Sequence, residues 1–335
     1  MLQPTFLLCL VLLVSGCATI EPPNPAYYDI EPGQLPAPTV TLNIPGLGPC
    51  TDNPDRSLHL DANQPVNVLV HGCFGSSGNF RGLAQVLAFH GQQSACFTYD
   101  DRAALDESAA NLRQALGQLS ARTQTPQITL IGHSQGALIS RRSLTEPAFT
   151  PEQRQSNLRL VTISGPFDGI AAARTCGLGW LQVLSLGLLP VSCHLLTGPK
   201  WADITSSSPF IRQPGQLTPE VSRYLKIDTD ERDTCRQFKD GKCAQDDDIF
   251  SLAEQHNQII ETDPRMQRVV VQAGHVEIVG DKRIAPTKLI AVLQAQNILR
   301  NTPPERARAF TQLLAQVYQE HSVRANTQSA LGNLP

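Results

Sequence analysis

The sequence predicts an α/β fold, in which a mostly parallel central sheet carries helices on both faces. Short apolar segments rich in β-branched residues alternate with longer segments of helical periodicity from about residue 65 onward. The strand-like segments are apolar at nearly every position, which is typical of parallel strands that are buried on both faces. With 335 residues, of which 41% are hydrophobic, the chain is large enough to bury such a sheet.

The expected elements follow one another in alternation. Strands are expected over residues 66–70, 94–99, 127–131, 158–163, 223–227 and 268–271. Helices are expected over residues 81–89, 106–119, 137–144, 287–299 and 304–319. In the second of these helices, Ala109, Leu112, Leu116 and Leu119 lie on one helical face. We therefore expect one large domain over residues 56–322, followed by a C-terminal tail over 323–335.

Residues 1–16 predict an export signal outside the fold. The apolar run from Phe6 to Val14 is too short to cross a bilayer, and Ser15, Gly16 and Cys17 follow it. The sequence Val-Ser-Gly-Cys resembles the bacterial lipobox, although an ordinary cleaved signal peptide is the alternative. The resemblance implies that Cys17 is lipidated and anchors the protein in the bacterial cell envelope. Ala18 after the cysteine favours the outer membrane, facing the periplasm.

Residues 17–55 are rich in proline, with eight prolines between Glu21 and Pro49. Proline fixes φ and disrupts regular strand pairing, so this segment predicts an extended tether between the lipid anchor and the domain. The alternative is that part of the segment packs along the domain as an edge.

Seven cysteines follow Cys17, and an exported chain reaches a compartment that permits disulfides. Cys235 and Cys243 are close together in a polar segment, whereas Cys176 and Cys193 bracket an apolar one, so both pairs are candidate bridges. The remaining connectivity does not follow from the sequence. No C-x-x-C pair is present, so we expect no zinc site.

The charge pattern excludes one class of partner. The net charge is −3 and no basic stripe is present, so we expect no nucleic-acid binding. Nothing in the sequence indicates an oligomeric state.

The strongest chemical signal is the pentapeptide Gly132-His133-Ser134-Gln135-Gly136. It has the G-x-S-x-G pattern, an apolar segment precedes it and an Ala-Leu-rich helical segment follows. This setting predicts a nucleophile elbow, a sharp strand-to-helix turn that exposes the Ser134 hydroxyl. The turn also places the serine at a helix N-terminus, where backbone N–H groups can stabilise an oxyanion.

From about Pro65 to Leu299 the chain resembles the α/β-hydrolase family, and within it the lipase-like esterases. A second motif, His71-Gly72-Cys73-Phe74-Gly75-Ser76, directly follows an apolar strand, as in that family. The resemblance implies an oxyanion hole formed by the backbone N–H groups of Cys73 and Gln135, with Phe74 as the second choice for the first position. His71 and His133 belong to the two motifs and are expected to be structural.

The family order of nucleophile, acid and base implies a late histidine as the base. His275 fits, because it follows the expected strand 268–271 in an Ala-Gly-His turn. The acid is expected after the preceding strand, where Asp247 begins an Asp-Asp-Ile-Phe sequence similar to that of the family. Asp248, Asp228 and Asp230 remain as alternatives.

A cap insertion is expected over about residues 170–216, where lipase-like relatives carry one. Within it, residues 177–196 are almost wholly apolar and include Trp180, Leu184 and Leu188. This segment either covers an acyl-binding pocket as a lid that opens on lipid, or forms a buried helical excursion.

The resemblance implies a serine carboxylic-ester hydrolase of the lipase-like kind, whose Ser-Asp-His triad acts through an acyl-enzyme without metal or organic cofactor. Its expected partners are a lipid or ester substrate and the membrane that holds its anchor. The same triad would also serve an acyltransferase or a thioesterase. The alternative from another class is a non-catalytic lipoprotein that binds lipid or a partner protein.

Overall fold

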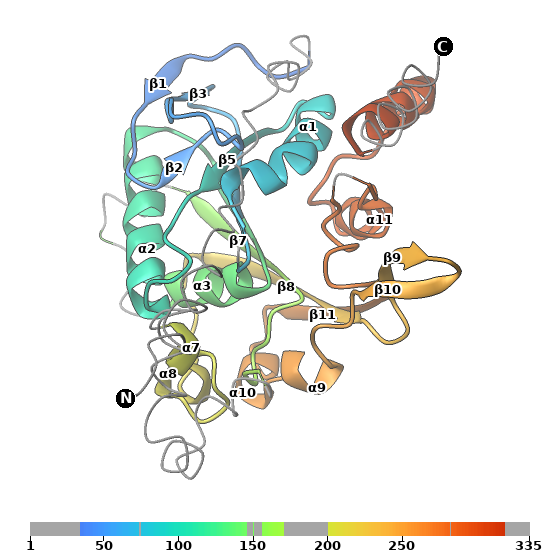
Figure 1. The fold of residues 1–335 in the computed structure, drawn as a ribbon. Coiled ribbons are helices and arrows are strands. Elements are labelled where there is room, and N and C mark those ends of the chain that lie inside the picture. The colour runs from blue at the N-terminus through green and yellow to red at the C-terminus, as the bar shows by residue number, and fades with distance from the viewer. Residues whose placement is uncertain are drawn as a thin grey trace, which may run out of the picture.

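A computed structural model describes residues 34–73, 75–145, 150, 156–170, 200–281 and 283–318. Its centre is a seven-stranded sheet in the order β11-β8-β7-β6-β4-β5-β2 (Figure 1). The strands are β2 (Leu47–Gly48), β4 (Val66–Val70), β5 (Gln93–Phe97), β6 (Gln127–His133), β7 (Asn157–Ile163), β8 (Val221–Asp230) and β11 (Met266–Gln272). All neighbours pair in parallel except β2, which pairs with β5 in the antiparallel sense. The expected mostly parallel sheet is therefore confirmed.

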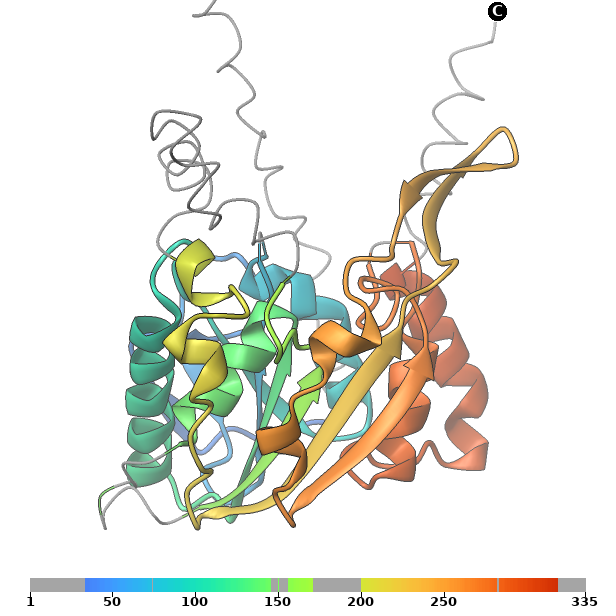
Figure 2. The same cartoon turned by 90° about the horizontal axis from the view of Figure 1, so that it is seen from below.

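Helices cover both faces of the sheet (Figures 1 and 2). On one face lie α2 (Leu105–Arg122) and α3 (Gln135–Ser143), whose apolar residues share a core with Val68 and Leu130 of the sheet. On the other face, α1 (Arg81–Phe89) and α11 (Thr287–Ala295) pack on Leu69 and Ile131. Alternate residues of one strand thus enter two separate cores, which explains why the strands are apolar throughout.

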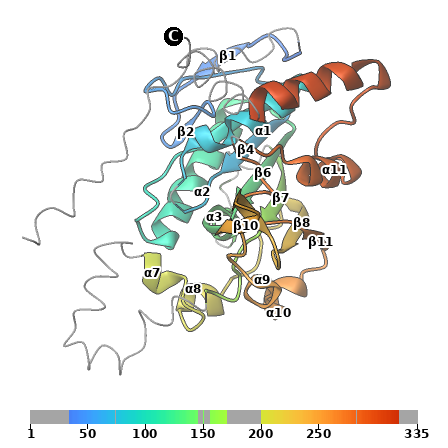
Figure 3. The ribbon, with the colours of Figure 1, turned by 45° about the vertical axis from the view of Figure 1, so that its right-hand side comes forward.

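A C-terminal helix over residues 307–318 lies alongside α1 (Figure 3). The rings of Phe89 and Phe310 are 5.1 Å apart between centroids. The remaining elements are short. They are β1 (Val40–Leu42), β3 (Leu58–Leu60), β9 (Cys235–Lys239), β10 (Lys242–Asp246), α7 (Lys200–Asp203), α8 (Pro209–Arg212), α9 (Leu252–Gln255), α10 (Gln258–Glu261) and the 3-10 turns η2 (Ser77–Phe80) and η4 (Pro304–Arg306). None of the helices that the structure describes is long and apolar enough to cross a membrane.

Part of the proline-rich segment is built into the domain. Residues 40–42 pair with 58–60, and Leu47–Gly48 forms the edge strand of the central sheet. A disulfide joins Cys50 to Cys96 of β5, a pairing that the sequence did not indicate. Residues 40–50 therefore pack along the edge of the domain, which was the alternative to an extended tether. Residues 17–33, like the signal segment and Cys17, lie outside the described residues.

The expected bridge between Cys235 and Cys243 is confirmed, and it closes the β9–β10 hairpin. This hairpin extends beyond the carboxyl ends of β8 and β11 (Figure 2). Cys176 and Cys193 lie outside the described residues.

Candidate active site

Ser134 lies at a sharp turn between β6 and α3. Its φ of 56° falls in a region that residues other than glycine rarely adopt. The turn is closed by glycines on either side. A Cβ on Gly132 would lie 2.3 Å from the carbonyl oxygen of Gly136, and a Cβ on Gly136 would lie 2.3 Å from that of His71. The two glycines of the motif are therefore required by the close approach of backbone segments.

The loop after β4 passes directly beside Ser134. A Cβ on Gly72 would come within 2.9 Å of the Cβ of Ser134. Gln135 is the first residue of α3, so its backbone N–H has no partner inside the helix. Among the described residues, no group accepts a hydrogen bond from this N–H. The turn thus presents a serine hydroxyl and an open backbone donor next to the 71–73 loop.

His71 is buried and fixes the course of this loop. Its ring stacks on Tyr99 at 4.4 Å between centroids, and the Tyr99 hydroxyl donates a hydrogen bond of 2.7 Å to the His71 carbonyl. Burial lowers the pKa of His71 and raises that of Tyr99, so both side chains stay neutral near pH 7. Ring stacking and the Tyr99 hydrogen bond thus hold this loop in place.

Cys73 forms no disulfide, and its thiol accepts a hydrogen bond from a buried lysine. Lys200 Nζ lies 2.9 Å from Cys73 Sγ and 3.2 Å from Asp101 Oδ2. The Asp101 backbone carbonyl in turn accepts a hydrogen bond of 3.3 Å from Gln135 Nε2. Lys200 and Asp101 were not anticipated from the sequence, since both stand in segments without a motif.

His275 is held beside the turn that carries Ser134. It follows β11 by three residues and is buried. Its backbone carbonyl lies 2.9 Å from Nε2 of His133, and the two rings are 4.7 Å apart between centroids. Because a carbonyl can only accept, His133 Nε2 donates this bond. Burial, and to a smaller extent the electrostatic interaction with His275, place the pKa of His133 well below its usual value.

Glu231 provides the carboxylate that contacts the His275 ring. Its Oε1 lies 2.9 Å from His275 Nδ1, and the side chain is fully buried. Thr229 Oγ1 donates 2.7 Å to the same oxygen. The other oxygen accepts backbone N–H groups of Ile249 and Phe250, each at 2.7 Å. Three donors besides the ring thus satisfy this buried carboxylate and hold it in place.

The carboxylate against the His275 ring is not the one that the sequence predicted. Asp247 is also buried, but its carboxylate accepts backbone N–H groups of Val276 and Glu277 at 2.9–3.1 Å and does not bind the His275 ring. Its backbone carbonyl accepts the N–H of His275 at 2.9 Å. Asp247 therefore shapes the turn that contains His275, while Glu231 contacts the imidazole.

The three alternative acids lie elsewhere. Asp228 is buried between Lys226 and Arg268, at 2.6 and 2.7 Å. Asp230 pairs with Arg232. Asp248 is exposed, and slight burial together with the field of Glu231 raises its pKa.

The sequence did not predict Glu231 as the partner of His275, because the expected strand was too short. β8 runs from Val221 to Asp230, three residues past the expected end at Ile227. Glu231 is the first residue beyond the strand, at the same sheet edge as the exit of β11. Residues 224–229 are all buried, but Lys226, Asp228 and Thr229 are polar, so the hydrophobic pattern of the sequence does not extend the strand to Asp230.

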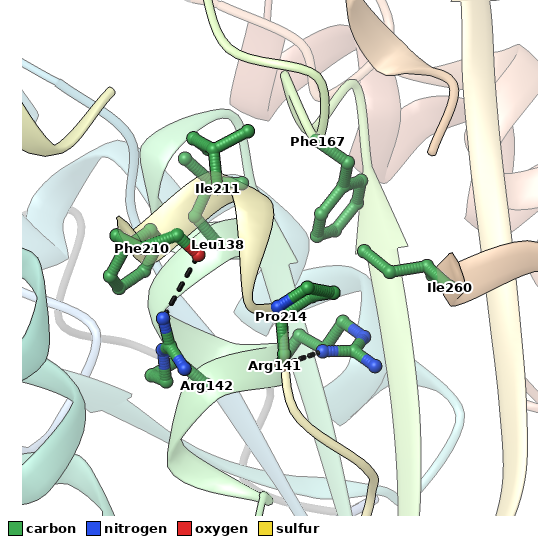
Figure 4. A pocket seen from close by; sticks show the side chains of 8 residues that line it. All are labelled: Leu138, Arg141, Arg142, Phe167, Phe210, Ile211, Pro214 and Ile260. Atoms are coloured by element: carbon green, nitrogen blue, oxygen red, sulfur yellow. Dashed lines mark hydrogen bonds between the residues drawn. The ribbon is translucent and has the colours of Figure 1, made fainter. Parts of the chain in front are cut away.

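A small pocket lies between α3, α8 and α10 (Figure 4). Its volume is about 20 Å³, enough for about one water molecule and far too small for an acyl chain. Two arginines of α3 form one wall. Arg141 donates to the carbonyls of Pro214 and Gly215, and Arg142 donates to that of Phe210. These bonds fix residues 209–215, the end of the expected cap, onto α3.

Several expectations lie outside the described residues, namely Phe74 and the apolar segment 177–196 with Trp180, Leu184 and Leu188. Within the described ranges, no cluster of three or more His, Cys, Asp or Glu side chains is arranged to hold a metal ion.

Comparison with known proteins gives a fold. No protein-family model matches the sequence, and no curated protein matches it. The mature form of a Bacillus licheniformis lipase, BlEst2, is similar with a TM-score of 0.50 and 15% identity, covering 79% of this chain and 100% of that chain. The propeptide form of BlEst2 gives a TM-score of 0.53 and 15% identity, covering 80% of this chain and 55% of that chain. Together with the sheet order, this likeness shows that the chain has the α/β-hydrolase fold.

Proposed function

We propose that this protein is a serine carboxylic-ester hydrolase in which Ser134, His275 and Glu231 form the catalytic triad. The observation that carries the proposal is the contact between His275 Nδ1 and the buried Glu231 carboxylate, beside a serine held at a positive φ. A carboxylate on one ring nitrogen keeps a proton there and leaves the other nitrogen free to act as a base. The fold neighbour BlEst2, described as a lipase, supports the same reaction class.

In this mechanism the Ser134 hydroxyl attacks the ester carbonyl while His275 takes its proton. The proton then passes to the leaving alcohol, and water activated by the same histidine releases the acid from the acyl-enzyme. Backbone N–H groups of Gln135 and Cys73 receive the developing oxyanion. The Glu231 carboxylate, which Thr229 and two backbone donors hold in place, stabilises the imidazolium.

The first test replaces the nucleophile. Ser134→Ala should lower kcat by about 10⁴-fold or more on a soluble p-nitrophenyl ester, with the fold retained by circular dichroism. A fluorophosphonate probe should label the wild type and not the variant. Activity near that of the wild type in pure Ser134→Ala would refute the assignment.

Product analysis with added alcohols and thioesters distinguishes hydrolysis from acyl transfer and thioester cleavage. A wild type that takes up no probe and cleaves no ester would instead favour the non-catalytic binding lipoprotein.

We further propose that the protein is a lipoprotein anchored through Cys17 in the bacterial cell envelope, in the outer membrane facing the periplasm. The support is the Val-Ser-Gly-Cys sequence after a short apolar run. Cys17→Ala should abolish metabolic labelling with palmitate and release the protein from the membrane fraction. Unchanged fractionation would refute the anchor and leave the esterase proposal intact.

A lipid-like acyl ester is the substrate class that we propose. An envelope location would place the enzyme beside lipids, and the apolar segment 177–196 belongs to the expected cap. A series of p-nitrophenyl esters of increasing chain length, assayed beside triglyceride and phospholipid, tests this choice. Preference for the shortest esters would contradict it.

A further inference from the structure

Both peptide segments assigned to the oxyanion hole are tied to one ion pair that lies outside the triad. Lys200 opens α7, at the point within the expected cap where the described chain resumes. Its side chain is 1% exposed and reaches the Cys73 thiol and the Asp101 carboxylate together. Asp101 belongs to the segment after β5, whose Tyr99 also holds the His71 carbonyl.

The contacts reach the two halves of the hole from a single point. On one side, Lys200 Nζ donates to Cys73 Sγ at 2.9 Å, and Cys73 supplies the first N–H. On the other side, the Asp101 carbonyl accepts the Gln135 side chain at 3.3 Å, and Gln135 supplies the second N–H. The ion pair between Lys200 and Asp101 therefore links the two segments that carry these N–H groups.

A buried lysine is costly to the fold unless a carboxylate balances its charge. Asp101 supplies that carboxylate, and α7 is also attached to α2, because Asp203 Oδ2 accepts the N–H of Leu105 at 2.9 Å. An apolar residue would fill this position without the cost of burying a charge, so packing alone does not account for a lysine here. Preorganised donors contribute to catalysis only when they are held at the position of the oxyanion.

We propose that Lys200 is a positioning residue for the oxyanion hole, which links the docking of α7 to the geometry of the Cys73 and Gln135 N–H groups. This proposal rests on the proposed esterase function. Lys200 touches neither the substrate nor the reacting atoms; it acts through Cys73 and Asp101.

The proposal predicts a selective loss of transition-state stabilisation. Removal of a whole oxyanion donor costs about 10²- to 10³-fold in kcat, so displacement of one should cost roughly 10- to 100-fold. Lys200→Met should therefore lower kcat by that factor and change KM by no more than about two-fold. The affinity for a trifluoromethyl ketone, which forms a tetrahedral adduct with the serine, should fall by the same factor. The affinity for the product alcohol should not change.

Matched variants separate positioning from stability. Lys242→Met makes the same change at an exposed site on β10 and should behave as the wild type. Lys200→Arg keeps the charge and should recover part of kcat. Lys200→Met removes the Lys200–Asp101 ion pair from a buried position, so we combine it with Asp101→Asn. The double variant should regain the thermal stability lost in Lys200→Met while kcat stays low.

Two results would overturn the proposal. One is a Lys200→Met enzyme whose kcat or ketone affinity stays within two-fold of the wild type. The other is a double variant that regains kcat together with stability, because that would reduce Lys200 to a purely structural role. Failure of the esterase proposal has a different signature, since Ser134→Ala would then remain active in the same assay.

Discussion

The two halves of the candidate site are built in different ways. The half that carries Ser134 is one continuous stretch from β6 through the turn into α3, and its geometry depends on glycines two residues away on either side. The half that carries His275 joins residues 44 apart in sequence, from the exit of β8 and from the turn after β11. A short motif can specify the first half, whereas only the packed sheet specifies the second.

The same contrast applies to the two buried carboxylates near His275. Glu231 contacts the His275 ring, whereas Asp247 accepts the backbone N–H groups of Val276 and Glu277, the two residues after His275. The residues after Asp247 also supply the two N–H groups that hold Glu231. The Asp-Asp-Ile-Phe sequence resembles the motif that carries the acid in the family, but here its backbone N–H groups hold the Glu231 carboxylate.

The largest effect expected from this comparison distinguishes the two carboxylates. Glu231→Gln should lower kcat by about 10³- to 10⁴-fold. The N–H groups of Ile249 and Phe250 will hold the amide oxygen, so the NH₂ group will face His275 Nδ1. That donor forces the histidine into the tautomer that cannot accept the Ser134 proton. Steady-state kinetics on a soluble ester, per folded protein, measures the loss.

Asp247→Asn is the matched comparison. It should lower kcat by less than about ten-fold but destabilise the protein, because a charge-assisted bond contributes about 1.5–3 kcal/mol. Urea unfolding measures that loss. A larger kinetic defect in Asp247→Asn than in Glu231→Gln would return the acid role to Asp247.

The same distinction determines which features of the fold and the site can be predicted from the sequence. The parallel sheet, both helical layers and the Ser134 turn follow from periodicity and from glycine spacing, which are properties of neighbouring residues. The position of His275 is also predictable from the sequence, because this residue closely follows an expected strand. Glu231 is not, since its selection depends on where β8 ends and on donors from residues 249 and 250. Lys200 and Asp101 are further examples, because they meet across 99 residues.

The disulfides extend this comparison from the site to stability. The predicted Cys235–Cys243 bridge spans 8 residues, whereas the unanticipated Cys50–Cys96 bridge spans 46 residues. Loop-closure entropy gives the longer bridge roughly 4 kcal/mol and the shorter one about 2.5 kcal/mol. Cys50 and Cys96 are also buried in the core below α1, whereas the hairpin is largely exposed.

We therefore expect the double variant Cys50→Ser with Cys96→Ser to lose more unfolding free energy than Cys235→Ser with Cys243→Ser. Urea denaturation under non-reducing conditions measures both. The hairpin variant should retain most of its activity, because Glu231 and Asp247 are held by contacts outside the bridge. If the two pairs lose equal stability, loop length does not govern their contributions.

The smallest expected effect concerns the pH dependence of stability, and it arises where the two halves meet. Burial lowers the pKa of His133 in the folded state, so the unfolded chain binds more protons below about pH 6.5. Stability should therefore be fully present above that pH and decline as the pH falls. The limiting slope from one such histidine is about 1.4 kcal/mol per pH unit. Urea unfolding between pH 7.5 and about 5.5 covers the start of this window.

His133→Asn isolates this contribution. Burial also lowers the pKa values of His71 and His90, while Asp203 and Asp248 have raised pKa values that act with the opposite sign. The difference in slope between wild type and variant removes these shared contributions. The variant should be less stable than the wild type at about pH 7.5, because the bond to the His275 carbonyl is weakened or lost, yet its stability should fall less steeply with acid. Parallel slopes would show that His133 keeps an ordinary pKa, and hence that its ring does not stay neutral between the nucleophile turn and the base.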